Sequence, residues 1–187
     1  MIFLNLENNI IRSGIKEWGQ WFMKEILHED FNENTFKLIG NDWMLLTAEK
    51  EGKVNTMTAS WGGLGVIWNK KVAYIFIRPQ RYTKEFIDAS ERLSISVLPN
   101  SYRKELGYLG RVSGRDEDKI SQANLTVKKY EDVPYFEEAR LTLVCKKLYA
   151  QYLEEKCFIE QDIIEQCYPE KDYHMMYVVE IEKILEK

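Results

Sequence analysis

The segment with the clearest chemical potential contains two arginines that follow an apolar run and precede a helix-like stretch. Arg78 and Arg81 lie in the sequence IRPQRYT, which ends on Thr83. Guanidinium groups bind phosphate oxygens in a forked geometry, and a helix N-terminus adds unpaired amides and a partial positive charge. The segment therefore indicates a phosphate site. An equally good alternative is that the two arginines pair with carboxylates such as Glu85 and Asp88 on a solvated face.

A second basic segment, SGRDEDK, opens another helix-like stretch. Arg115 and Lys119 are four residues apart and are expected on one helical face, where both could reach one anion. In the alternative, Asp116 or Asp118 neutralises them as an ordinary acid of the first helical turn, which needs no ligand.

A third segment, NTMTASWGG, is a strand-like run of small and hydroxyl residues that leads into Trp61 and a glycine pair. Small residues let a planar, hydrogen-bonding ring approach the backbone closely, and the tryptophan supplies a flat apolar surface. Taken alone, the pattern favours the alternative of a strand that has a polar, solvent-exposed face and ends at a turn.

A fourth segment, DYH near the C-terminus, contains a histidine. Asp172 and His174 share a face if the chain is extended there. One histidine is a poor metal site, and His28 lies in a separate predicted helix, so we expect a structural hydrogen bond and no metal. No serine, cysteine or histidine arrangement points to a nucleophilic triad.

The elements that must position these segments are mostly strands. Apolar or alternating runs bounded by turn residues predict strands near Trp43–Ala48, Val54–Ser60, Val72–Ile77, Arg92–Leu98, Arg140–Tyr152 and Met175–Leu185. Helix-like stretches lie at Tyr82–Ser90, Tyr102–Tyr108, Asp116–Asn124 and Ile159–Cys167. Gly52 marks a hairpin turn. The short, scattered helices favour a mainly β fold, a closed barrel with peripheral helices, over a doubly wound sheet.

An amphipathic helix is predicted before the barrel, at residues 13–28. Ile15, Trp18, Phe22 and Ile26 recur at spacings of three and four with charges between them. We therefore divide the chain into an N-terminal helical extension (1–32) and one barrel domain (33–187).

Composition narrows the class of protein. A chain of 187 residues with 45% hydrophobic residues can bury one domain core. The formal net charge of −4 offers no basic field for nucleic acid, and no apolar run reaches the roughly 20 residues that span a bilayer. Met1–Asn8 has no signal-like pattern, so a cytoplasmic protein without a membrane partner is expected. Three cysteines, an odd number without metal-site spacing, are expected as reduced thiols.

Together and in this order, the segments NTMTASWGG, IRPQRYT, SGRDEDK and DYH resemble the flavin reductase-like domain family, which includes the flavoredoxins. The resemblance covers roughly residues 33–187 and implies an FMN-binding split β-barrel that forms a homodimer, with FMN near the subunit interface. It implies that the isoalloxazine ring lies along Met57, Thr58, Ala59, Ser60 and Trp61. It implies that the ribityl phosphate is surrounded by Arg78, Gln80, Arg81, Tyr82, Thr83, Ser113, Gly114, Arg115 and Lys119. His174 is a weaker candidate, close to the flavin.

The reaction is less defined than the cofactor. We expect an oxidoreductase in which FMN carries the redox chemistry, so that no catalytic residue is predicted. NADH or NADPH is the favoured electron donor and would be held weakly, because the sequence has no GxGxxG fingerprint. The alternatives are a flavoredoxin-like electron carrier that serves a redox protein partner, and a flavin-binding module without turnover.

Overall fold

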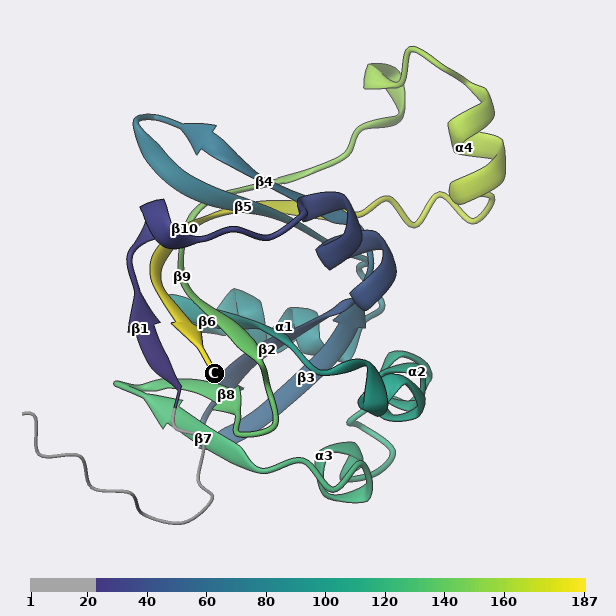
Figure 1. Cartoon of the computed structure of the whole chain (residues 1–187). Helices are drawn as coiled ribbons and strands as arrows, with labels where there is room; N and C mark the ends of the chain where they lie inside the picture. Colours follow the sequence, from purple (N-terminus) through teal and green to yellow (C-terminus); the bar gives the residue numbers. More distant parts are fainter. Residues whose placement is uncertain (1–22) are drawn as a thin grey trace, which may run out of the picture.

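The computed structural model of the chain describes residues 23–187, and its centre is a curved antiparallel sheet (Figure 1). The order of strands across the sheet is β3 (Lys53–Ala59), β2 (Met44–Lys50), β6 (Arg92–Val97), β9 (Leu141–Tyr152), β10 (Met175–Glu186), β5 (Lys70–Ile77) and β4 (Gly62–Ile67). Every neighbouring pair on this path is antiparallel.

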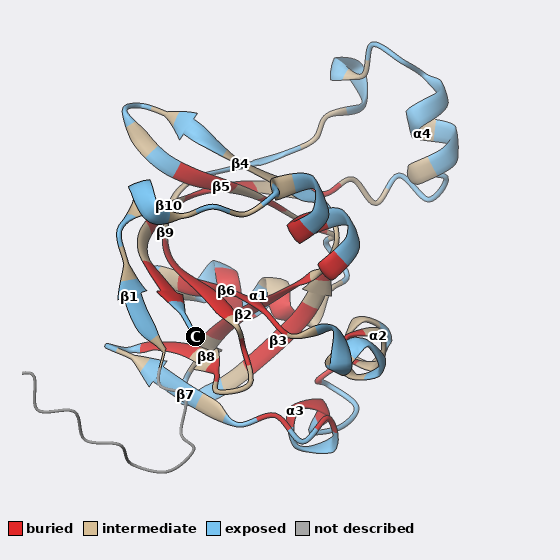
Figure 2. Ribbon diagram, in the orientation of Figure 1, coloured by how far each residue is buried: buried red, intermediate tan, exposed pale blue. Residues whose placement is uncertain are grey.

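The sheet curls around one core because its central strands are long and bent. β9 and β10 have 12 residues each, and their pairing shifts register between Val178 and Val179 and again between Ile181 and Lys183. Such bulges bend a strand and increase its twist. Buried side chains from both halves of the sheet, among them Leu46 and Ile75, therefore meet in a single apolar cluster. The buried residues are the red segments of the strands in Figure 2.

The barrel is split between the two strands that end the path. β3 and β4 are joined only by Ser60 and Trp61, yet no pairing connects them within residues 23–187. Each strand already pairs along its other edge, β3 with β2 and β4 with β5. The prediction of a closed barrel is corrected in this respect: the fold is mainly β with peripheral helices, but its sheet stays open at this edge.

Helices cover the β2–β3 side of the sheet. α1 (Tyr82–Ala89) buries Phe86 and Ile87 and contacts β2 and β3, and α2 (Arg103–Arg111) contacts β3. Beyond them lie α3 (Lys119–Gln122) and the hairpin of β7 (Val127–Tyr130) and β8 (Val133–Phe136). α4 (Asp162–Cys167) belongs to the segment between β9 and β10, which projects from the barrel in Figure 1.

Most of the predicted elements are confirmed. All six predicted strands are present, and the turn at Glu51 and Gly52 has positive φ at both residues (53° and 78°), as a two-residue hairpin requires. The predicted helix at Asp116–Asn124 is wrong in extent, because only Lys119–Gln122 is helical.

The predicted helix at 13–28 is wrong over its last residues. Lys24–Ile26 forms β1, which pairs with the C-terminal half of β10 and places Ile26 against the main core. His28–Asp30 is a short 3₁₀ turn. Backbone hydrogen bonding to the edge of β10 therefore determines the conformation of Lys24–Ile26, although the spacing of the side chains is helical. Residues 13–22 of that prediction lie outside the described residues, and so does most of the proposed extension.

No helix within residues 23–187 has the length and apolar character needed to cross a membrane.

Candidate functional site

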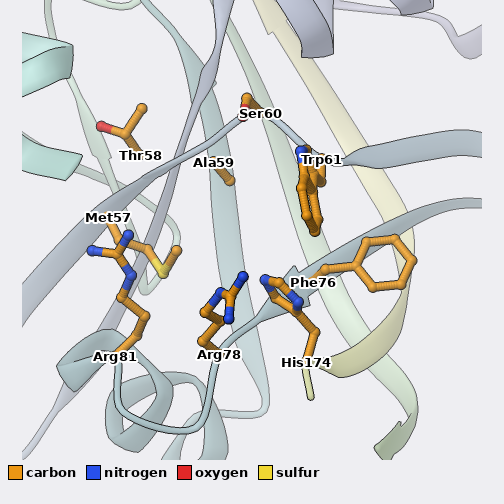
Figure 3. Close-up of a pocket in the computed structure, with 9 residues that line it drawn as sticks. All are labelled: Met57, Thr58, Ala59, Ser60, Trp61, Phe76, Arg78, Arg81 and His174. Atoms are coloured by element: carbon orange, nitrogen blue, oxygen red, sulfur yellow. The ribbon is translucent and has the colours of Figure 1, made fainter. Parts of the chain in front are cut away.

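A hollow of about 240 Å³ opens at the split edge of the barrel (Figure 3). Its residues come from the end of β3, the link to β4, the end of β5 and the residue before β10. They are Met57, Thr58, Ala59, Ser60, Trp61, Phe76, Arg78, Arg81 and His174. The predicted ring-binding segment Met57–Trp61 thus lines one hollow together with His174 and two of the predicted arginines.

A second hollow of about 230 Å³ adjoins the first and shares Met57, Arg78 and Arg81 with it. It lies at the N-terminus of α1 and the C-terminus of α2. Its other lining residues are Gln80, Tyr82, Thr83, Arg111, Val112, Ser113 and Lys119. The two hollows together give an elongated space with an aromatic end and a basic end.

The basic end is built by Arg81 and Lys119 on the last carbonyls of α2. Arg81 donates from Nη1 to the carbonyl of Gly110 (2.6 Å), and Lys119 donates from Nζ to those of Leu109 (3.0 Å) and Val112 (2.9 Å). These carbonyls lack partners within their own helix and carry its partial negative charge, which stabilises a nearby cation.

No carboxylate of the described residues neutralises the positive charge of these two groups. Neither Arg81 nor Lys119 forms an ion pair with any residue from 23 to 187. Lys119 is only 4% exposed, and burial together with the charge of Arg81 lowers its pKa to about 8. Burial and the charge of Arg78 also lower the pKa of Arg81. Two crowded, desolvated cations facing one hollow are suited to binding an anion.

Arg78 is held differently. Its guanidinium forms an ion pair with Asp172 and donates from Nη2 to the carbonyl of Cys167 (2.8 Å), while Gln80 donates to the same Asp172 carboxylate (2.7 Å). The alternative of carboxylate partners therefore holds for Arg78, although the partner is Asp172 and not Glu85 or Asp88; within residues 23–187 it is wrong for Arg81. Arg78 instead ties the first hollow to the segment between β9 and β10.

Arg115 does not join Lys119 on a helical face, contrary to the prediction. It lies in a turn before α3, where its guanidinium pairs with Glu85 and lies over the ring of Tyr82 (4.5 Å to the centroid). It lines a third hollow, which Lys119 also lines, while Asp118 caps α3 by accepting from the amide of Ser121 (3.2 Å). Glu85 thus neutralises Arg115, and the ammonium group of Lys119 is directed to the carbonyls at the end of α2.

Thr83 and Gly114 are placed by Asn55, a buried residue of β3. Asn55 donates from Nδ2 to Oγ1 of Thr83 (3.1 Å), which leaves the hydroxyl hydrogen of Thr83 free to donate. A Cβ added at Gly114 would lie 2.4 Å from Oδ1 of Asn55. Gly114 therefore allows the loop at 113–115 to pack directly on this amide.

We expect Gly114→Ala to destabilise the fold by about 1–3 kcal/mol, because the methyl group overpacks the contact with Asn55. Gly107→Ala is the matched control: it lies in α2 with no atom within 4 Å of the added Cβ, and should stabilise by roughly 0.5–1 kcal/mol. Urea unfolding of both variants measures the difference. Equal stability of the two variants would show that the loop shifts without cost.

His174 is packed among aromatic rings at the other end of the space. It is 8% exposed and lies 5.1 Å from Trp61 and 6.5 Å from Phe76, between ring centroids, and Figure 3 shows it beside these rings and Arg78. Burial and the charge of Arg78 lower its pKa to about 4, so the ring is neutral at pH 7. Nδ1 of His174 is hydrogen-bonded to the hydroxyl of Tyr168 (2.9 Å), whereas Asp172 pairs with Arg78.

The sequence reasoning missed Phe76, Arg111 and Val112, which line the two hollows, and Tyr168. The alternation along β5 could have indicated Phe76, because Phe76 and Arg78 share one face of an extended chain. No group of three or more metal-ligating side chains occurs within residues 23–187.

Comparison with solved structures shows the same fold in several FMN-binding proteins. An FMN-binding domain of a flavin reductases-like enzyme from Shewanella baltica superposes with a TM-score of 0.65 at 17% identity, covering 88% of this chain and 76% of that one. Flavoredoxin from Methanosarcina acetivorans gives 0.61 at 24% identity (78% and 68%). An FMN-binding protein from Thermus thermophilus gives 0.61 at 18% identity (97% and 82%).

These similarities show the split-barrel fold. A sequence comparison with curated proteins finds no match. The family model described as "Flavin reductase like domain" matches residues 36–184, which is most of the chain and contains every residue that lines the two hollows. The chain belongs to the flavin reductase-like domain family.

Proposed function

We propose that this chain binds FMN across the two adjoining hollows and acts as an oxidoreductase. The observation that carries the proposal is the pair Arg81 and Lys119, two desolvated cations without a carboxylate partner in the described part of the chain, at one end of an elongated space. One terminal phosphate matches this charge. The first-turn amides of α1 and the free hydroxyl hydrogen of Thr83 add donors at the same place.

The aromatic end of the space fits the ring of the same cofactor. Met57, Ala59, Trp61 and Phe76 offer apolar surface, and β3 and β4 are edge strands that present unpaired backbone groups. FMN would supply the electron-transfer chemistry when bound. The residues of the chain would bind its phosphate, orient its ring and shield one side of it from water. The FMN-binding relatives in the structural comparison support this assignment.

We propose NADH or NADPH as the electron donor and free flavin or another small molecule as the acceptor. Anaerobic mixing of the FMN-loaded protein with NADH and with NADPH, followed by flavin absorbance, tests this choice. Rapid bleaching supports the reductase. Slow or absent bleaching with both nucleotides, together with reduction by a redox protein, would favour a flavoredoxin-like carrier, which a flavoredoxin among the structural relatives supports. No reduction by any donor would leave a flavin-binding module.

We also propose that the site is completed in a homodimer. Trp61 lines the first hollow and is still 47% exposed, and the large apolar side chains Phe36, Val66 and Trp68 are exposed on the same chain. A twofold contact would cover the same patch on both subunits and give two equivalent sites.

The dimer predicts that FMN occupancy falls together with dimer content on dilution. Sedimentation velocity with detection at flavin and protein wavelengths measures both quantities in one experiment. A monomer that retains a full equivalent of FMN would contradict the proposal, and would leave the exposed Trp61 to be explained by other means.

A further inference from the structure

His174 is fixed in place by a tyrosine from the projecting segment between β9 and β10. The hydroxyl oxygen of Tyr168 lies 2.9 Å from Nδ1 of His174, and Tyr168 is only 3% exposed. The backbone amide of Tyr168 donates to the carbonyl of Ile164 (2.8 Å), at the end of α4. The guanidinium of Arg78 lies 5.3 Å from the centre of the phenol ring. Both the phenol ring and the backbone of Tyr168 are therefore fixed by contacts with neighbouring residues.

The direction of this hydrogen bond follows from the surroundings of the phenol. Within residues 23–187, Nδ1 of His174 is the only hydrogen-bond partner of the Tyr168 hydroxyl. If the hydroxyl oxygen accepted a hydrogen bond from an Nδ1–H group, its own hydrogen would be buried without an acceptor, which costs about 1–3 kcal/mol. Tyr168 therefore donates, and Nδ1 of His174 accepts.

The other nitrogen of His174 then carries the hydrogen. A neutral imidazole that accepts at Nδ1 has its proton on Nε2. The ring stays neutral because burial and the nearby charge of Arg78 lower its pKa to about 4; Asp172 opposes this shift, and Arg81 adds to it. Because Nδ1 is engaged on the Tyr168 side, Nε2 is the nitrogen available to the hollow that His174 lines.

We propose that Tyr168 is a positioning residue that holds His174 as the Nε2–H tautomer, so that His174 offers an uncharged hydrogen-bond donor to a carbonyl oxygen in the hollow. Such an oxygen occurs on a flavin ring and on the carboxamide of a nicotinamide. The inference rests on the proposed function, because the ligand is the flavin or its electron donor. Tyr168 itself lines neither hollow.

The tautomer can be measured on the full chain without any ligand. The chain has two histidines, so long-range ¹⁵N–¹H NMR of histidine-labelled protein gives two ring systems, and His28→Gln identifies the second. We expect His174 to show a protonated Nε2 and a hydrogen-bonded Nδ1. In Tyr168→Phe, which keeps the ring, the hydrogen-bond shift of Nδ1 should be lost. A protonated Nδ1 in the wild-type protein, or an unchanged spectrum in the variant, would overturn the proposal.

A double-mutant cycle tests whether Tyr168 acts through His174. Tyr168→Phe should weaken FMN binding or raise the KM for the nicotinamide by roughly 2- to 12-fold, the range for one hydrogen bond. The same substitution made in His174→Gln should have no further effect. Equal losses in both backgrounds would show that Tyr168 only supports the fold.

Tyr173→Phe is the matched control. Tyr173 packs 5.1 Å from Tyr168, and its hydroxyl lies near Glu155, not against His174. This variant should keep both the His174 spectrum and the affinities. The two claims can fail separately. If neither the wild-type protein nor the variants bind flavin but the NMR spectra are as expected, the proposed function is wrong and the positioning of His174 by Tyr168 is still supported.

Discussion

Replacing Arg81 with alanine is expected to weaken FMN binding by about 1.5–3 kcal/mol, the range for hydrogen bonds to charged groups, which corresponds to roughly 10- to 150-fold. Arg81 is half-buried, has no carboxylate partner within residues 23–187 and lines both hollows. The guanidinium can therefore bind a phosphate without first breaking an ion pair within the described residues. Riboflavin, which lacks the phosphate, should bind nearly unchanged.

Two comparisons separate this effect from a loss of structure. Arg115→Ala removes the same type of side chain from a neighbouring position, but Arg115 is already paired with Glu85, so we expect a much smaller loss of FMN affinity. Isothermal titration of both variants with FMN and riboflavin gives all four values. If Arg81→Ala weakened both ligands equally, the role of Arg81 would be to support the fold.

The affinity for FMN should also fall as the pH rises through about 8. The pKa of Lys119 is lowered to about 8 by burial and by Arg81, so its ammonium group is largely protonated at pH 7 and loses its proton above pH 8. A phosphate dianion binds the protonated form, which makes the affinity full below this pKa and weaker above it. The second pKa of a phosphate monoester is about 6, so the ligand's own charge does not change in this window.

We expect a loss of up to about tenfold between pH 7.5 and roughly 9, within the range for one charge-assisted bond. Lys119→Met should remove this pH dependence, and Arg81→Ala should move it to higher pH because it removes the neighbouring positive charge. Titrations with FMN across this range measure the effect, and riboflavin should show no such change. An FMN affinity that is constant from pH 7 to 9.5 would mean that Lys119 does not contact the phosphate.

Six strands of the barrel could be predicted because they are apolar or alternating runs bounded by turn residues, such as Glu51 and Gly52. β4 was missed because it begins with Gly62 and Gly63, which lower strand propensity. The reason for glycine is a distant contact: a Cβ at Gly62 would lie 2.7 Å from the carbonyl oxygen of Tyr74. Sequence spacing does not reveal such a contact.

The residue types of the candidate site could be predicted, but their pairing could not. Arg78 and Asp172 are 94 positions apart, and Arg115 and Glu85 are 30 positions apart, so neither ion pair follows from local periodicity. The helical pattern placed Lys119 on one face with Arg115, but the side chain of Lys119 is buried (4% exposed) against the end of α2. Tyr168 carried no signal, because its partner His174 is defined only by the folded segment between β9 and β10.

The central claim, that the two hollows hold FMN, is tested most directly by titrating the purified full chain with FMN and recording the flavin absorption and fluorescence. We predict a shifted flavin spectrum that saturates at one FMN per chain, with weaker binding of riboflavin, which lacks the phosphate, and of FAD, whose second half has no basic counterpart in the site. An FMN spectrum that stays identical to that of the free cofactor at all protein concentrations would contradict the account.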